Sequence, residues 1–155
     1  MPDKTGENNQ ANQSENRLVA LLKELVELYR EALNLEEELT GIISSGDVKE
    51  LRINTNAKLD LMARIEKTNS ELFPVIEKYK TGEGAFNNGA AELLRREALA
   101  LLGKIEQAEQ KNLDAIAEGR KKLLDGFRRA KHAKKTMQGY KRSRTPFRSR
   151  FDTKS

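Results

Sequence analysis

The sequence is short of the residues on which most catalytic and metal sites depend. Its 155 residues include no cysteine, no tryptophan and a single histidine, and only 5% of them are aromatic. The absence of cysteine excludes disulfides, thiolate zinc sites and cysteine nucleophiles. The chain also contains no H-x-x-x-H, G-x-S-x-G or Walker-type motif. We therefore expect a protein that is not an enzyme and that binds no metal or cofactor.

Long apolar segments are absent as well. The longest apolar runs, at 18–22 and 98–102, have five residues, whereas a membrane-spanning helix needs about 20. The first 16 residues are polar and lack the apolar region of a secretory signal. These features predict a soluble, cytoplasmic protein that is not inserted in a membrane.

Charged and helix-forming residues are abundant instead. Leu, Ala, Glu, Lys and Arg dominate, which is typical of long helices. The net charge of +5 is unevenly placed, because residues 120–154 hold 14 Lys and Arg against two acids, whereas residues 1–119 hold 15 against 22. A basic end on an acidic body indicates an acidic partner, such as nucleic acid, a membrane surface or an acidic protein segment. The alternative is a solvated tail that keeps the protein soluble.

Apolar residues repeat every seven positions over 16–44 and predict the first helix. The polar residues 1–15 cannot bury enough apolar surface and are predicted to be a disordered tail. Ser44 to Gly46 end the first helix, and Asp47 is placed to cap a second, with Glu50 completing a capping-box-like pair. A tight helical hairpin follows. The repeat consists of Leu18, Leu25, Ala32 and Leu39 at one position and Leu21, Leu28, Leu35 and Ile42 at the other, with Leu22, Tyr29 and Ile43 widening the stripe.

The second helix, over 47–80, has a weaker repeat. The polar stretch 54–56 interrupts it, and Pro74 lacks an amide hydrogen and should kink the helix or end its regular part. Local loosening at Pro74 is a simpler interpretation than a hinge. One heptad position holds Leu51, Lys58, Ile65, Leu72 and Tyr79, and the other holds Thr55, Met62, Asn69 and Ile76.

The glycine-rich segment 81–89 is a connector. No Lys-Ser or Lys-Thr pair follows it, so it is not a phosphate-binding loop. A third helix is predicted over 90–137, followed by a basic flexible tail at 138–155. The fold prediction is all-α, an antiparallel three-helix bundle or coiled-coil hairpin with a long projecting third helix. The apolar face of the third helix consists of Leu94, Ala98, Leu101, Ile105, Ala108, Asn112 and Ala115.

The predicted lengths of the helices indicate a binding surface. At a rise of 1.5 Å per residue the first two helices are about 44 and 51 Å long and the third about 72 Å. The hairpin cannot cover the last turns of the third helix, and an exposed apolar strip there would mark an interaction site. Its natural complement is an acidic amphipathic helix, unless the first helix or a second copy covers it. The strip consists of Leu123, Leu124, Phe127 and Ala130, flanked by cations that include Arg128.

Two other polar groups are interpreted as surface residues. Glu36, Glu37 and Glu38 are neighbours on a helix and therefore point apart, which predicts a solvated face and not a paired-carboxylate site. His132 lies among Lys and Arg residues and is predicted to be a surface residue.

Several of these features resemble a known family. The acidic Leu-rich first helix, the Gly46–Asp47 turn and the long third helix with a basic end resemble the bacterial flagellar export chaperones of the FlgN/FliT type. Tyr140 and the terminal Arg150-Phe151-Asp152-Thr153-Lys154 match a tyrosine and an aromatic-basic terminus of that family. The resemblance implies a cytoplasmic chaperone that binds the C-terminal helices of hook-associated proteins for type III export. It also implies that Leu123, Phe127 and Ala130 contact the substrate and that Tyr140 contacts the export gate or ATPase complex.

Two other functions remain alternatives. The basic end could neutralise phosphates of nucleic acid, with a strong dependence on salt. Tyr140, Phe147 and Phe151 are too few and too irregular to form a stacking platform, which disfavours nucleic acid. A structural coiled-coil protein that forms a homodimer through the first helix is the other alternative.

Overall fold

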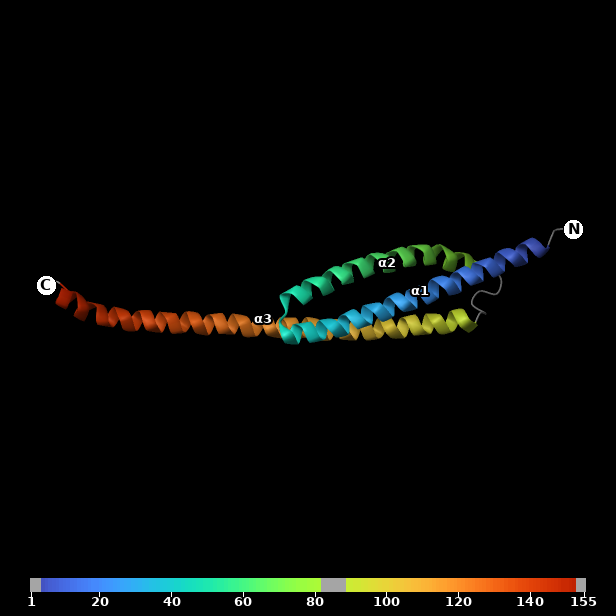
Figure 1. Cartoon of the computed structure of the whole chain (residues 1–155). Helices are drawn as coiled ribbons and strands as arrows, with labels where there is room; N and C mark the ends of the chain where they lie inside the picture. Colours follow the sequence, from blue (N-terminus) through green and yellow to red (C-terminus); the bar gives the residue numbers. More distant parts are fainter. Residues whose placement is uncertain (1–3, 82–88, 153–155) are drawn as a thin grey trace. The chain divides into compact units, whose positions relative to one another are not determined.

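The computed structural model describes residues 4–81 and 89–152, with side chains over 13–78 and 89–139. It consists of three α-helices, α1 (Lys4–Ser45), α2 (Val48–Thr81) and α3 (Gly89–Asp152), shown in Figure 1. The described ranges contain no strand, and α3 is the longest helix at 64 residues. The all-α prediction with a long third helix is confirmed. The chain divides into two compact units. Residues 1–113 contain α1, α2 and the first part of α3, and residues 114–155 contain the later part of α3.

The outer helix ends differ from the prediction. α1 begins at Lys4 and not at residue 16, so residues 4–15 are helical where a disordered tail was predicted. α3 continues to Asp152, past the predicted end at 137 and into the predicted flexible tail. Both segments extend a helix that is already nucleated, which needs no new nucleus. Their Glu, Gln, Lys and Arg residues favour the helix, whereas Gly6, Gly139 and Pro146 oppose it, which is why the sequence predicted shorter helices. Most of the predicted connector, residues 82–88, lies outside the described residues.

The turn between α1 and α2 is built as predicted. Gly46 has a φ of 71°, and its N–H donates to the Ile42 carbonyl oxygen at 2.9 Å. A side chain at this φ is disfavoured, which explains glycine at the C-terminal end of the helix. The Asp47 carboxylate accepts hydrogen bonds from the backbone N–H groups of Lys49 at 3.0 Å and Glu50 at 3.2 Å, so Asp47 caps α2.

Helix α1 contacts both other helices of the first unit. Arg64 of α2 pairs with Glu31 at 3.2 Å, and Asn54, earlier in α2, donates to the later Leu35 carbonyl at 3.0 Å, so the two helices are antiparallel. In α3, Glu97 pairs with Arg30 and the later Asn112 bonds to Glu36, so α3 runs parallel to α1. The bundle is therefore up-down-up, with α1 held from two sides.

The seven-residue repeat of α1 forms the core. All eight residues of its two main positions are buried or half-buried, which confirms the predicted heptad. Val26, which lies outside both positions, is also buried, because a helix packed from two sides buries more than one seam. The core cluster contains Leu18, Leu21, Leu22, Leu25, Leu72, Val75 and Ala91.

The packed face of α2 differs from the prediction. The second heptad position lies three residues after Leu51, Lys58, Ile65 and Leu72, and not four. Both spacings fit one side of a helix, and the side toward α1 is decided by packing. Met62 and Asn69, predicted in the seam, are exposed. The buried position is occupied by Asn54, Leu61, Thr68 and Val75.

Helix α2 continues through Pro74 to Thr81. Pro74 therefore does not end the helix, although it has no N–H to donate to the Ser70 carbonyl. Ser70 and Pro74 are both exposed, so the carbonyl oxygen that loses this donor belongs to an exposed part of the helix.

A polar node, defined by Glu36, Thr40, Lys58 and Asn112, lies within the bundle. Glu36 is 1% exposed and Asn112 2%. The Asn112 amide donates to the Glu36 carbonyl oxygen and to its carboxylate, both at 2.8 Å, and accepts from the Thr40 hydroxyl at 2.7 Å. The other carboxylate oxygen of Glu36 forms an ion pair with Lys58. The node thus joins all three helices through one buried carboxylate.

The node corrects the prediction of a solvated face at Glu36 to Glu38. Glu37 and Glu38 are exposed as predicted, whereas Glu36 is buried. Glu36 lies seven residues after Tyr29 and fourteen after Leu22, so it occupies the position that widens the apolar stripe. Lys58 supplies the counter-charge at Oε1 of Glu36, and the Asn112 amide donates to Oε2; among the described residues Oε1 has this ion pair but no hydrogen bond.

Two ion pairs on the surface of the bundle shift the pKa values of their groups. The hydrogen bond and the charge of Glu97 raise the pKa of Arg30 above its ordinary value. In the first turn of α3, the hydrogen bond from Arg95 holds the pKa of the Glu92 carboxyl below its ordinary value. Because the arginine side chains of these pairs are exposed to water, which screens the charges, each pair contributes little to stability.

Replacing Gly46 tests the turn. We expect Gly46→Ala to lower the free energy of unfolding by about 1 kcal/mol, because an alanine at positive φ is strained. Gly41→Ala is the control, since Gly41 lies inside α1 with open space around it and should gain helix propensity. Urea denaturation followed by circular dichroism measures both. Equal effects of the two substitutions would contradict the role of the turn.

Removing Lys58 tests the node. Lys58→Met leaves the Glu36 carboxylate buried without a counter-charge and is expected to destabilise the bundle by about 3 kcal/mol. In a Glu36→Gln background the same substitution should cost less than about 1 kcal/mol, because no buried charge remains. Urea unfolding of the four proteins gives the coupling between the two positions. A cost of Lys58→Met that is the same in both backgrounds would show that the ion pair does not matter.

Candidate partner-binding surface

Burial on α3 ends at Asn112. The predicted apolar face is buried or half-buried from Leu94 to Asn112, but Ala115 is exposed, contrary to the prediction. From Leu113 to Gly139 every residue is exposed except Asp125, which is half-buried. Apolar side chains in this part of α3 therefore lie in contact with solvent.

The predicted strip lies in the second unit, on α3. Leu123 is 66% exposed, Leu124 47% and Phe127 70%. Ala130 and Arg128 are exposed too. Positions 123, 127 and 130 are spaced by four and three residues, so they share one face of the helix. The side chain of Tyr140 lies outside the described residues, so its predicted role is not addressed by the structure.

The strip is surrounded by positive charge. Residues 120–137 hold eight Lys and Arg and one acid, Asp125. Lys122 contacts Glu118 at 3.6 Å, but with both groups exposed this pair is weak and does not neutralise the surface. An apolar strip with cations on both sides suits an amphipathic helix that carries acidic residues. The cations nearest the strip are Arg120, Lys121, Lys122, Arg128, Arg129 and Lys131, all exposed.

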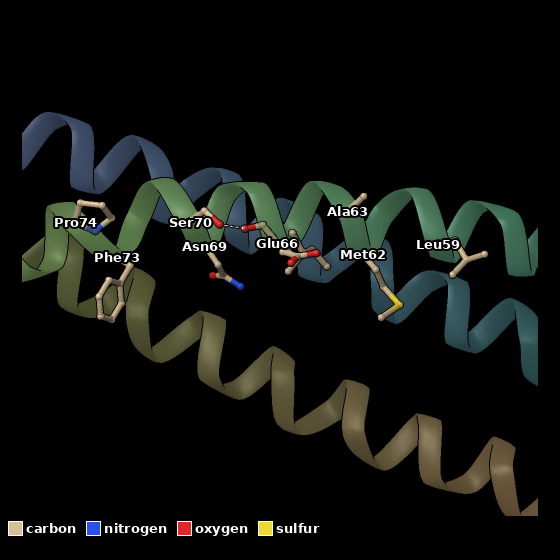
Figure 2. A pocket seen from close by; sticks show the side chains of 9 residues that line it. Leu59, Met62, Ala63, Glu66, Asn69, Ser70, Phe73 and Pro74 are labelled. Carbon is tan, nitrogen blue, oxygen red and sulfur yellow. Dashed lines mark hydrogen bonds between the residues drawn. The ribbon is translucent and has the colours of Figure 1, made fainter.

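A second apolar surface, which was not predicted from the sequence, lies on α2. A groove of about 860 Å³ follows α2 over 59–74 (Figure 2). Its apolar side chains include Leu59, Met62 and Phe73, and its one charged side chain is Glu66. The signal was present in the spacing of the lining, because Leu59, Met62, Glu66, Asn69 and Phe73 follow one another at intervals of three and four.

The remaining polar residues bear on whether the described part of the chain could hold a metal ion. His132 is exposed, as predicted from its charged neighbours. Over residues 4–81 and 89–152, no group of three or more His, Asp or Glu side chains is arranged to hold a metal ion. In the same ranges no helix is long and apolar enough to cross a membrane.

Comparisons with known proteins add no relative. No family model, no curated protein and no solved structure matches this chain. The two apolar surfaces and the charges around them are therefore the structural features that bear on function.

Replacing Phe127 tests whether the strip lies outside the core. We expect Phe127→Ser to change the free energy of unfolding by less than about 0.5 kcal/mol, as exposed substitutions do. Leu28→Ala is the contrast, since Leu28 is 2% exposed, and it should cost about 2–5 kcal/mol. Urea denaturation at low protein concentration makes the comparison. A Phe127→Ser cost in the range of Leu28→Ala would show that Phe127 is packed.

Proposed function

We propose that this protein is a cytoplasmic, non-enzymatic chaperone of the FlgN/FliT type. Its substrates are the amphipathic C-terminal helices of hook-associated flagellar subunits, which it delivers to the type III export apparatus. The observation that supports this proposal is the exposed strip of Leu123, Leu124, Phe127 and Ala130 within a cationic part of α3.

The strip has the chemistry of a surface that binds a helix. Exposed apolar side chains on one helix face gain free energy when a second helix covers them, about 1.5–3 kcal/mol for each large side chain fully buried. The cations beside them attract acidic residues of the partner and determine its orientation. Four apolar residues make a small interface, which suits a partner that must later be released.

The proposal assigns different roles to the strip and to the following residues. Leu123, Phe127 and Ala130 contact the substrate helix, and Arg128 pairs with one of its acids. Tyr140 contacts the export gate or the ATPase complex, as the family resemblance implies. The bundle of α1, α2 and the first part of α3 supplies the stable part of the carrier.

A titration with peptides tests the proposal. Fluorescently labelled peptides from the C-terminal helices of hook-associated proteins should bind the wild-type protein, and Phe127→Glu should weaken binding at least tenfold. Leu93→Glu is the matched control, because Leu93 is 67% exposed on the same helix, against 70% for Phe127. A peptide of the same composition in scrambled order controls for charge alone.

The outcomes separate the alternatives. Absence of binding to every such peptide, or equal loss in Phe127→Glu and Leu93→Glu, would contradict the chaperone proposal. Binding of random duplex DNA that falls steeply with salt and does not depend on Phe127 would favour a nucleic-acid function instead.

A further inference from the structure

The strip in the later part of α3 belongs to a longer apolar face. Ile116 lies seven residues before Leu123, and Met137 lies seven residues after Ala130, so both share the side of the helix that carries Phe127. Ile116 is 45% exposed and Met137 63%. From Ile116 to Met137 this extended strip is about 32 Å long, at a rise of 1.5 Å per residue. The helix thus presents one continuous apolar side to solvent.

Positive charge lies within the extended strip as well as beside it. Arg120 and Lys134 each stand four residues after one apolar residue of the strip and three before the next. Such long side chains can lay their methylene groups along an apolar surface while the charged ends stay in a polar layer. Asp125, the one acid of residues 120–137, lies two residues from both Leu123 and Phe127 and therefore points away from the strip.

A cationic helix with one apolar side restricts the partner. A nucleic acid would pair with the cations but would leave the apolar side chains in water. A second copy of the strip would bring two sets of cations together, which is unfavourable. The surface of a membrane with anionic lipids offers negative headgroups directly above the acyl chains, so it satisfies the cations and the apolar side chains together.

We propose that the extended strip of α3 binds the surface of a membrane that contains anionic lipids, with the helix lying in the plane of the headgroups. Leu123, Phe127 and Met137 enter the boundary between the headgroups and the acyl chains. Arg120 and Lys134 pair with lipid phosphates. The helix does not cross the bilayer, because only one of its sides is apolar. This binding requires the later part of α3 alone.

The lipid site goes beyond the proposed chaperone function, although the two share side chains. Phe127 cannot contact a substrate helix and a lipid surface at once, so each ligand should displace the other. Met137 lies outside the residues assigned to the substrate. A substitution of Met137 should therefore weaken the binding of lipid and leave the binding of substrate peptide unchanged.

Co-sedimentation of the full chain with lipid vesicles tests the inference. Vesicles of phosphatidylcholine with about one third phosphatidylglycerol should bind the wild type, and less so at high salt. Vesicles of phosphatidylcholine alone should bind it about tenfold more weakly. Met137→Glu should weaken binding to the anionic vesicles about tenfold, because it places a negative charge at the lipid surface. Leu93→Glu is the matched control, since Leu93 is 67% exposed on α3 within the first unit.

The lack of tryptophan in the chain allows a second measurement. Phe127→Trp introduces a single indole on the strip. Its fluorescence should shift to shorter wavelength when the anionic vesicles are added, because the ring leaves water for the headgroup layer. Leu93→Trp should show no shift. Circular dichroism checks that the variants remain helical.

Each outcome supports or overturns the inference. Binding to the anionic vesicles, with the shift in Phe127→Trp and the loss in Met137→Glu, supports it. No binding at low salt, equal binding to both kinds of vesicle, binding without the shift, or a loss in Leu93→Glu as large as in Met137→Glu would overturn it. Binding of random duplex DNA but of no vesicle would overturn it in favour of nucleic acid. If the vesicles bind and the hook-associated peptides do not, the proposed function fails and this inference stands; the reverse result overturns this inference alone.

Discussion

The burial of α1 from two sides is the constraint on which the bundle depends. α1 is the helix that pairs with both α2 and α3, and its leucines form the largest part of the core cluster. Leu18, Leu21, Leu22 and Leu25 are each at most 6% exposed, and removing their apolar surface from water stabilises the bundle. The apolar stripe of α1 is wide because α1 packs against two helices, whereas a helix with one neighbour needs only a narrow apolar stripe.

The polar node gives this apolar arrangement a definite alignment. Leucines pack against leucines in several registers with similar free energies, whereas Asn112 can satisfy both Glu36 and Thr40 in only one. A shift of α3 by one turn along α1 would separate the Asn112 amide from Glu36 and Thr40 and would leave the Glu36 carboxylate with Lys58 alone. The node thus determines which residue of α3 is the last to be buried, and so which apolar residues of α3 remain exposed.

The sequence predicts most of the fold and one of the two exposed apolar surfaces, the strip on α3. The heptad of α1 and the Gly46–Asp47 turn are local signals, and the structure agrees with both. The buried face of α2 is predicted less well. Residues three and four positions after a heptad residue both lie near it on the helix, and only packing against α1 decides which of the two is buried. The exposure of Leu123 and Phe127 follows from the length of the third helix. The burial of Glu36 depends on Lys58 and Asn112, which are distant in sequence, although its place in the repeat was visible. The outer ends are predicted least well, because α1 begins at Lys4, within a polar segment, and α3 continues past Gly139 and Pro146, two residues that commonly end a helix.

The proline in α2 has a chemical consequence for the groove. Because Pro74 has no N–H, the carbonyl oxygen of Ser70 lacks its usual helical donor, and both residues belong to the lining of the groove. The wall therefore carries a main-chain acceptor one turn from the Glu66 carboxylate. A lysine or arginine side chain has several donors, and one guanidinium can bond a carboxylate and a peptide oxygen together. Proline at this position thus adds one hydrogen-bond acceptor, the Ser70 carbonyl oxygen, to a surface that is mostly apolar.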